Sequence, residues 1–392
     1  MTDGVPQRYA YGARASWGET VVAESDACLL VEKDGAPATL WFPESDIDRG
    51  LLGVAGEGVL FTCPDPSGPL APLLGHAAFD TDRVSVEVFD RDPGDERDGA
   101  LLRFPTWGDA SDLVEVMDVR PGGAARYTGP ARSDGRRPVV EGSQMLGQAI
   151  IAAGREHPDR RVVSASMMFL KGADARRPLA FELTELSVGR TFVGLAVQVL
   201  QEQRRCAAGT LLLDATAPAV VTHAVEPPDV PGPGECPPCD MGVTGRELRV
   251  VDGAYTDDPA APPGPPLLDC WVRFRHLPDD PVLHAGLLAQ FTGHMPIAAA
   301  LRPHQGTGQA EAHRTLSMGI NAITLSLHGA VRADEWMLYH HQSTFAGDGM
   351  THAECRVFTG AGVLLGSFSV DAMIRPFAKH VGAGSRDERT AL

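Results

Sequence analysis

The sequence predicts an α+β protein in which a small all-β domain precedes two copies of one pattern, a helix followed by strands. Three observations support this prediction. Short alternating segments fill residues 20–90, a helix pattern at 142–156 precedes four strand-like segments, and a helix pattern at 282–301 precedes four more. A helix followed by four strands is the order in which a curved antiparallel sheet wraps one central helix.

Composition and charge exclude several classes of protein. The 392 residues suffice for about two or three domains. With 34 Lys and Arg against 51 Asp and Glu, the formal net charge of −17 disfavours nucleic acid and anionic membrane surfaces as partners. A hydrophobic share of 43% excludes a wholly disordered chain. No apolar run approaches the roughly 18 residues of a membrane span, and the first residues lack the apolar core of a secretion signal, so we expect a soluble cytoplasmic protein.

Cysteine and histidine spacing predicts no metal site. The seven cysteines are scattered, which fits reduced thiols better than a disulfide framework. The CPPC motif at 236–239 supplies only two of the four ligands of a structural zinc site, with no second pair nearby. His340 and His341 are neighbours on a predicted strand, where successive side chains face opposite ways. His304 and His328 are interpreted as structural.

Residues 1–105 are predicted to form the small β domain. Its alternating segments each end at Gly, Pro or Asp, which is typical of antiparallel strands joined by short turns. The charged stretch 91–99 has no apolar period and is interpreted as a solvated boundary. The predicted strands are TVVAES at 20–25, ACLLVEK at 27–33, ATLWFP at 38–43, GVLFTC at 58–63 and RVSVEVFD at 83–90.

The rest of the chain is predicted to hold a structural duplication. The first copy spans 106–223 and the second 268–380, and they share the order of their elements but not their letters. Residues 224–267 are too rich in Pro for a packed core and are predicted to be a linker, and residues 381–392 are predicted to be a flexible tail. The predicted strands lie at 162–171, 179–186, 191–201 and 207–216 in the first copy and at 315–329, 336–345, 353–360 and 363–374 in the second.

Short motifs stand in both copies. They are VEGSQMLGQAI at 140–150, FLK at 169–171 followed by Asp174, GRTF at 189–192, ALRPH at 300–304, EWMLY at 335–339 and GVL at 362–364. In this order, residues 112–380 resemble the acyl-CoA thioesterase II family, whose members fold as a double hotdog. The resemblance implies two helix-wrapping antiparallel sheets that bind an acyl thioester without a cofactor.

The small β domain carries motifs of its own. They are VVAES at 21–25, WFP at 41–43, TCP at 62–64 and DRV at 82–84. These residues resemble a bacterial family of uncharacterised function, domain of unknown function 427. That family continues Cys-Pro with Tyr-Lys-Gly, whereas this sequence continues with DPSG at 65–68. The resemblance therefore implies no activity for this domain.

Three positions of the second copy bear on catalysis. Thioesterases of the double hotdog type activate a water molecule with an Asp on the second helix, a Thr on a following strand and a Gln on the last strand. Alignment through the motifs places Gly293, Ile320 and Val370 at these positions, so the resemblance implies that all three polar groups are replaced. Because successive strand side chains face opposite ways, Asn321 and Asp371 are expected to point away from the pocket.

Two ionisable side chains remain as alternative catalytic residues. His294 lies one residue further around the helix than Gly293, and Glu141 stands directly before the first-copy helix, where related enzymes place a catalytic acid. A carboxylate or imidazole beside hydrogen-bonding side chains can deprotonate a water molecule. The side chains predicted to contact the substrate are Gln144, Ser166, Gly293, Ile320, Thr324 and Val370.

Three functions remain open. The first is hydrolysis of an acyl thioester, linked to coenzyme A or to an acyl carrier protein, by a non-standard set of residues. The second is a cyclisation, isomerisation or elimination in natural-product biosynthesis, with an apolar cavity orienting a polyketide-like molecule. The third is a catalytically silent binding protein. The Ala-, Arg- and Asp-rich composition is typical of a high-GC actinobacterial protein, and a homodimer is compatible with the edge-to-edge assembly of such sheets.

Overall fold

The computed structural model divides the chain into two compact units. Their described parts lie within residues 5–103 and 110–376. The predicted boundary at 91–99 and the predicted tail at 381–392 lie outside the described residues. The structure describes residues 5–9, 12–18, 20–31, 39–53, 58–81, 83–89, 101–103, 110–131, 139–175, 177–239, 246–256, 260–275, 277–308 and 315–376.

The N-terminal unit contains two antiparallel sheets, with strand orders β1-β4-β5-β7-β6 and β3-β2-β8-β9. Phe42 and Phe79 meet edge to face in its core, with ring centroids 5.3 Å apart. The sequence pattern misses β2 and β7 because small residues such as Ala13 and Ala77 fill buried positions. The elements are β1 Gln7–Arg8, β2 Gly12–Trp17, β3 Thr20–Ser25, β4 Leu29–Val31, β5 Thr39–Pro43, η1 Glu44–Asp46, α1 Arg49–Leu52, β6 Leu60–Thr62, η3 Gly68–Leu73, β7 His76–Phe79, β8 Ser85–Phe89 and β9 Leu101–Arg103.

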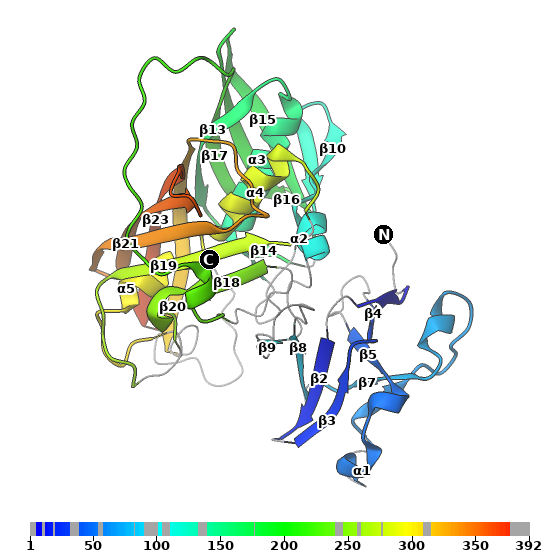
Figure 1. The fold of residues 1–392 in the computed structure, drawn as a ribbon. Helices are drawn as coiled ribbons and strands as arrows, with labels where there is room; N and C mark the ends of the chain where they lie inside the picture. Colours follow the sequence, from blue (N-terminus) through cyan, green and yellow to red (C-terminus); the bar gives the residue numbers. More distant parts are fainter. Residues whose placement is uncertain are drawn as a thin grey trace. The chain divides into compact units, whose positions relative to one another are not determined.

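The C-terminal unit is a long curved antiparallel sheet that surrounds helices α3 and α4 (Figure 1). Its helices are α2 Ala110–Met117, α3 Gly142–Glu156, η4 Pro233–Glu235, η5 Val251–Gly253, α4 Pro281–Phe291 and α5 Pro296–Leu301. Its strands are β10 Arg120–Gly123, β11 Arg126–Gly129, β12 Val139–Val140, β13 Arg161–Phe169, β14 Ala173–Asp174, β15 Leu179–Val188, β16 Phe192–Gln201, β17 Arg204–Asp214, β18 Arg246–Val250, β19 Leu267–Phe274, β20 Leu316–Leu327, β21 Met337–Gly347, β22 Met350–Thr359 and β23 Leu364–Pro376.

The strand order of this sheet repeats. One half runs β11-β15-β16-β17-β13 and the other runs β19-β21-β22-β23-β20, so both halves use the same succession of strands. β13 and β20, each the first long strand after the central helix of its copy, pair antiparallel with Ser166 opposite Thr324. The two predicted helix-wrapping units are therefore joined into one continuous sheet.

The central helices α3 and α4 pack antiparallel against each other. Gly154 near the end of α3 faces Val282 at the start of α4, and Gly147 faces Gly286 near the middle of the contact. A Cβ atom on Gly147 would lie 2.5 Å from the carbonyl oxygen of Gly286, so the helices approach too closely for a larger residue. As a result, the first turn of α3 meets the last turn of α4.

The structure differs from the sequence prediction at two places in this unit. The single helix predicted at 282–301 is divided into α4 and α5: Pro296 has no N–H to donate to the carbonyl of Thr292, the residue after α4, and it is the first residue of α5. The stretch 224–267, predicted to be a linker, contains the edge strand β18, whose alternate side chains are buried. None of the described helices is long and apolar enough to cross a membrane.

Candidate functional site

Glu141 is the residue directly before α3. Its backbone is extended and its side chain makes no capping hydrogen bond to the helix. The side chain keeps 32% of its surface exposed. Glu141 Oε2 accepts a hydrogen bond from Gln290 Nε2 at 3.4 Å and lies 3.4 Å from His294 Nε2. A carboxylate of the first copy therefore meets two polar side chains of the second copy.

His294 follows the last turn of α4, and Gln290 lies within that turn. Gln290 is fully buried and the His294 side chain is 5% exposed. The imidazole stacks on the ring of Phe291, with centroids 4.8 Å apart. Burial lowers the pKa of His294 well below its usual value, and the nearby charge of Arg246 lowers it further. The imidazole is consequently neutral at neutral pH.

Arg246, the first residue of β18, is the buried cation of this site. Its guanidinium carbon lies 4.9 Å from the centre of the Phe291 ring. Nη1 donates a hydrogen bond to Gln290 Oε1 at 3.3 Å and lies 3.2 Å from His294 Nε2. Burial lowers the pKa of Arg246 to about 10, opposed by the charge of Glu141, so the guanidinium stays protonated at neutral pH. We call Glu141, Arg246, Gln290 and His294 the polar cluster.

The structure thus brings together both predicted catalytic candidates and adds two residues that the sequence reasoning missed. Arg246 lies in the stretch predicted to be a linker, and no motif of the sequence points to Gln290. The alternation of buried residues in RELRV at 246–250 is a signal for a strand, but a five-residue segment between Pro-rich stretches gives it little weight. A charged residue such as Arg246 is buried only together with partners, and here these are Gln290 and His294, which are far away in the sequence.

The three aligned positions of the second copy lie in a packed, mostly apolar region. A Cβ atom on Gly293 would lie 2.6 Å from Ser143 Oγ and 3.2 Å from Ile320 Cδ1, so Gly293 packs between these two side chains. Val370 is buried on β23, opposite Ile323 of β20. A larger side chain at position 293 therefore requires Ser143 to move.

The two neighbours that were expected to point away behave differently. Asp371 is exposed and its carboxylate lies 2.7 Å from His352 Nδ1, while Val370 beside it is buried. Asn321 occupies a β-bulge, because Ile320 and Ala322 pair with successive residues of β23 and Asn321 has no partner there. Strict alternation does not apply at a bulge, and the Asn321 Oδ1 atom is shielded from solvent and has no hydrogen-bond partner within the part of the chain that the structure describes.

Three predicted contact residues lie away from the polar cluster. Ser166 Oγ and Thr324 Oγ1 are 2.9 Å apart on the outer face of the sheet, because the alternate residues on β13 and β20 are the ones buried toward the helices. Gln144 is fully buried, and its Nε2 donates to the carbonyl oxygen of Pro130 at 3.2 Å. These positions follow from strand parity on β13 and β20 and from the side of α3 that carries Gln144.

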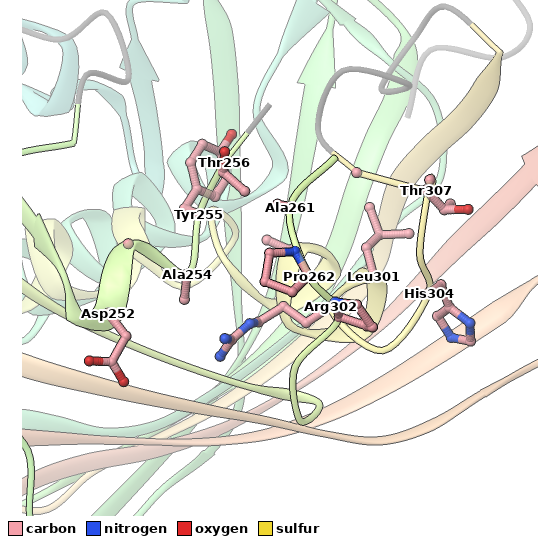
Figure 2. A pocket seen from close by; sticks show the side chains of 15 residues that line it. Asp252, Ala254, Tyr255, Thr256, Ala261, Pro262, Leu301, Arg302, His304 and Thr307 are labelled. Carbon is pink, nitrogen blue, oxygen red and sulfur yellow. The ribbon is translucent and has the colours of Figure 1, made fainter. Parts of the chain in front are cut away.

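A cavity of about 170 Å³ lies elsewhere in the C-terminal unit. Figure 2 shows Arg302 and His304, which follow α5, on one side of this cavity. Tyr255 and Thr256, which follow η5, lie on the other side. Arg302 Nη1 donates to the carbonyl oxygen of Leu267. None of the residues of the polar cluster lines this cavity. Within the described ranges, no three His, Cys, Asp or Glu side chains are grouped to hold a metal ion.

Comparisons with known proteins match this unit in two segments. Residues 131–213 match the acyl-CoA thioesterase N-terminal domain, and residues 221–369 match the acyl-CoA thioesterase C-terminal domain. Acyl-coenzyme A thioesterase 8 of Homo sapiens is 23% identical over 259 residues, which cover 60% of this chain and 80% of that protein. The corresponding protein of Mus musculus is 24% identical over 268 residues, with 60% and 79% covered.

Solved structures agree with these matches. An acyl-CoA thioesterase II of Mycobacterium marinum is 26% identical, with a TM-score of 0.57, and the match covers 67% of this chain and 98% of that one. The tesB protein of Mycobacterium avium subspecies paratuberculosis, at 22% identity and a TM-score of 0.57, covers 68% of this chain and all of its own, and it supports the double hotdog fold. Since both domain matches follow in order and together span more than half of the sequence, the chain belongs to the acyl-CoA thioesterase II family.

Proposed function

We propose that this protein hydrolyses acyl thioesters and that the Glu141 carboxylate is its general base. The observation that carries the proposal is the position of this carboxylate at the edge of the polar cluster. Glu141 is 32% exposed, whereas His294 behind it is 5% exposed. A group that must take a proton from a water molecule needs access to that molecule as well as neighbours that hold it in place.

The first turn of α3 supplies the second part of the proposed site. The first N–H groups of a helix have no partner within the helix, and the side chain of Glu141 does not cap them. Such groups stabilise negative charge that develops on a carbonyl oxygen. A thioester carbonyl placed against this turn would lie beside the Glu141 carboxylate.

The proposed reaction then follows in two steps. Glu141 takes a proton from water as the oxygen of that water bonds to the acyl carbon, and the carbonyl oxygen becomes an oxyanion facing the start of α3. The carbon–sulfur bond breaks as the carbonyl re-forms, and the proton held by Glu141 passes to the leaving sulfur. The products are a carboxylic acid and a free thiol, and Glu141 returns to its starting state.

The test is release of free thiol from short, long and aromatic acyl-CoA substrates, and from the same acyl groups on an acyl carrier protein. Glu141→Gln keeps the size of the side chain but removes the base, and kcat is expected to fall by about 10²–10⁴-fold. Glu156→Gln is the matched control, because Glu156 ends the same helix and accepts a hydrogen bond from Tyr127 at 2.7 Å. Full turnover in Glu141→Gln would reject Glu141 as the base.

One observation favours a second candidate function, a non-hydrolytic cyclase, isomerase or lyase. Gly293, Ile320 and Val370 offer no polar side chain at the three aligned positions, and an apolar surface orients a chain without acid or base. Silence of the folded protein in the thiol assay, together with a changed carbon skeleton in the recovered substrate, would support this candidate in place of hydrolysis.

A further inference from the structure

We propose that Arg246 is a positioning residue that holds His294 in its neutral Nδ1–H form and holds the Gln290 amide in one orientation, which leaves Glu141 as the proton-accepting group of the site. The role of Glu141 as the base rests on the proposed function. The protonation of His294 and the orientation of Gln290 do not depend on it, and both can be tested without a substrate.

The contacts of Arg246 Nη1 carry the first step. This nitrogen has two hydrogens and two neighbouring atoms that accept them, Gln290 Oε1 at 3.3 Å and His294 Nε2 at 3.2 Å. Because a guanidinium only donates hydrogen bonds, His294 Nε2 must present a lone pair to it. His294 Nε2 also lies 3.4 Å from Glu141 Oε2, and this carboxylate would instead favour a proton on Nε2. The two neighbours of Nε2 therefore make opposite demands.

The hydrogen bond from Arg246 decides between these demands. A proton on Nε2 would place an N–H group 3.2 Å from a guanidinium nitrogen that can only donate, whereas Glu141 Oε2 already accepts a hydrogen bond from Gln290 Nε2. Nδ1 is shielded from solvent and has no hydrogen-bond partner among the described residues. The contact with Arg246 therefore favours the neutral imidazole with its proton on Nδ1.

The Gln290 amide is oriented by the same guanidinium. Its oxygen accepts from Arg246 Nη1, so its nitrogen is left to donate to Glu141 Oε2 at 3.4 Å. A reversed amide would place its N–H hydrogens against the guanidinium and its oxygen against the carboxylate. Arg246 therefore reaches Glu141 through Gln290, and the carboxylate receives a hydrogen bond from a neutral donor.

The groups around Arg246 and His294 also favour a neutral His294. A second positive charge next to Arg246 is disfavoured in a site where His294 is 5% exposed. His294 faces Arg246 of β18, Glu141 before α3 and His341 of β21, whose pKa is lowered to about 4 by burial. The groups whose charges act on Arg246 are Glu141, Tyr339, Cys270 and Cys239.

The direct test is the nitrogen NMR spectrum of the full chain labelled with ¹⁵N-histidine, with the His294 signals assigned by their loss in His294→Gln. The expected spectrum is that of a neutral imidazole with its proton on Nδ1 from about pH 5 to about pH 8. A proton on Nε2, or titration of His294 within this range, would overturn the inference. Because no substrate is involved, the result is independent of whether the protein hydrolyses thioesters.

Two arginine variants test the cause. Arg246→Met removes the donor, so His294 is expected to titrate at higher pH than in the wild type, with its Nε2 now open to Glu141. Arg249→Met is the matched control, because Arg249 lies on the other face of the same strand and donates to the Cys236 carbonyl at 3.4 Å. Equal His294 spectra in Arg246→Met and the wild type would contradict the role of Arg246.

A third variant covers the case in which Arg246→Met fails to fold. Arg246→Lys keeps the positive charge but loses the planar pair of hydrogens on Nη1. In the thiol assay it is expected to lower kcat and leave KM unchanged, and its His294 spectrum is expected to show loss of the single Nδ1–H form. A wild-type spectrum in Arg246→Lys would show that charge alone is sufficient and would overturn the geometric role.

Discussion

Glu141 and His294 meet across the two copies of the duplicated unit, with 3.4 Å between Oε2 and Nε2. Glu141 precedes the central helix of the first copy, and His294 follows the central helix of the second. The meeting depends on the antiparallel packing of α3 and α4, which brings the start of one helix to the end of the other. A single copy therefore holds only part of the polar cluster.

Replacement of Gly147 by Ala tests this helix contact. The added Cβ atom would lie 2.5 Å from the backbone oxygen of Gly286, so the helices must separate. We expect a loss of about 1–3 kcal/mol in the free energy of unfolding, measured by urea denaturation, even though Ala favours helix. Gly286→Ala is the comparison, because its Cβ meets chiefly the flexible end of Ile151, and it should cost less. Equal stability of Gly147→Ala and the wild type would contradict the close approach.

Gly293 offers a second steric test. In Gly293→Ala the new Cβ meets Ser143 Oγ at 2.6 Å and Ser143 Cβ at 3.0 Å, and overpacking of this kind costs about 1–3 kcal/mol. Ser143→Gly removes both contacts, so the double variant should be more stable than the sum of the single effects predicts. A double-mutant cycle in urea measures this coupling. Additive effects would mean that the two positions do not press on each other.

Much of this architecture is predictable from local patterns. The helix α3 matches its predicted range because Met145, Ala149 and Ile150 repeat at helical spacing on a buried face. The long strands of both copies alternate regularly, which is why β16 and β23 lie within their predicted segments or close to them. These features depend on residues a few positions apart, and such spacing is visible in the sequence.

The polar cluster depends on residues far apart in the chain, and only part of it was predictable. The sequence indicates Glu141 and His294 separately, as alternatives, and nothing in their spacing indicates that they touch. Arg246 was hidden in a Pro-rich stretch, because a buried Arg is recognisable only when its partners are known. The bulge at Asn321 likewise arises from pairing with β23, which reverses the side-chain parity of β20.

The stability of the protein is expected to fall in mild acid. Burial lowers the pKa of His341 from 6.5 to about 4, and that of His294 also falls well below its usual value. Below about pH 6.5 the unfolded chain binds protons that the folded chain does not, so the stabilisation present above that pH is lost as pH falls. Each such histidine contributes a slope of about 1.4 kcal/mol per pH unit.

Urea denaturation between about pH 5 and about pH 8 measures that slope. His341→Gln should lower the slope by about 1.4 kcal/mol per pH unit, which is the contribution of one proton, whatever the substitution does to stability at neutral pH. His223→Gln is the control substitution, because the His223 side chain is exposed. If His341→Gln and the wild type lose stability equally in acid, His341 is not one of the groups that cause the loss.

Substitution of Ser166 or Thr324 tests whether their hydrogen bond has a structural or a catalytic role. The two hydroxyl oxygens are 2.9 Å apart where β13 and β20 join the two halves of the sheet, and Thr324 is exposed. Thr324→Val and Ser166→Ala should each cost at most about 0.5–1.5 kcal/mol in the free energy of unfolding, because water replaces the lost partner. Since both side chains face away from the helices, kcat and KM for thiol release should stay at wild-type values in each variant. A folded variant with a large loss in kcat would instead place this pair among the groups that act on the substrate.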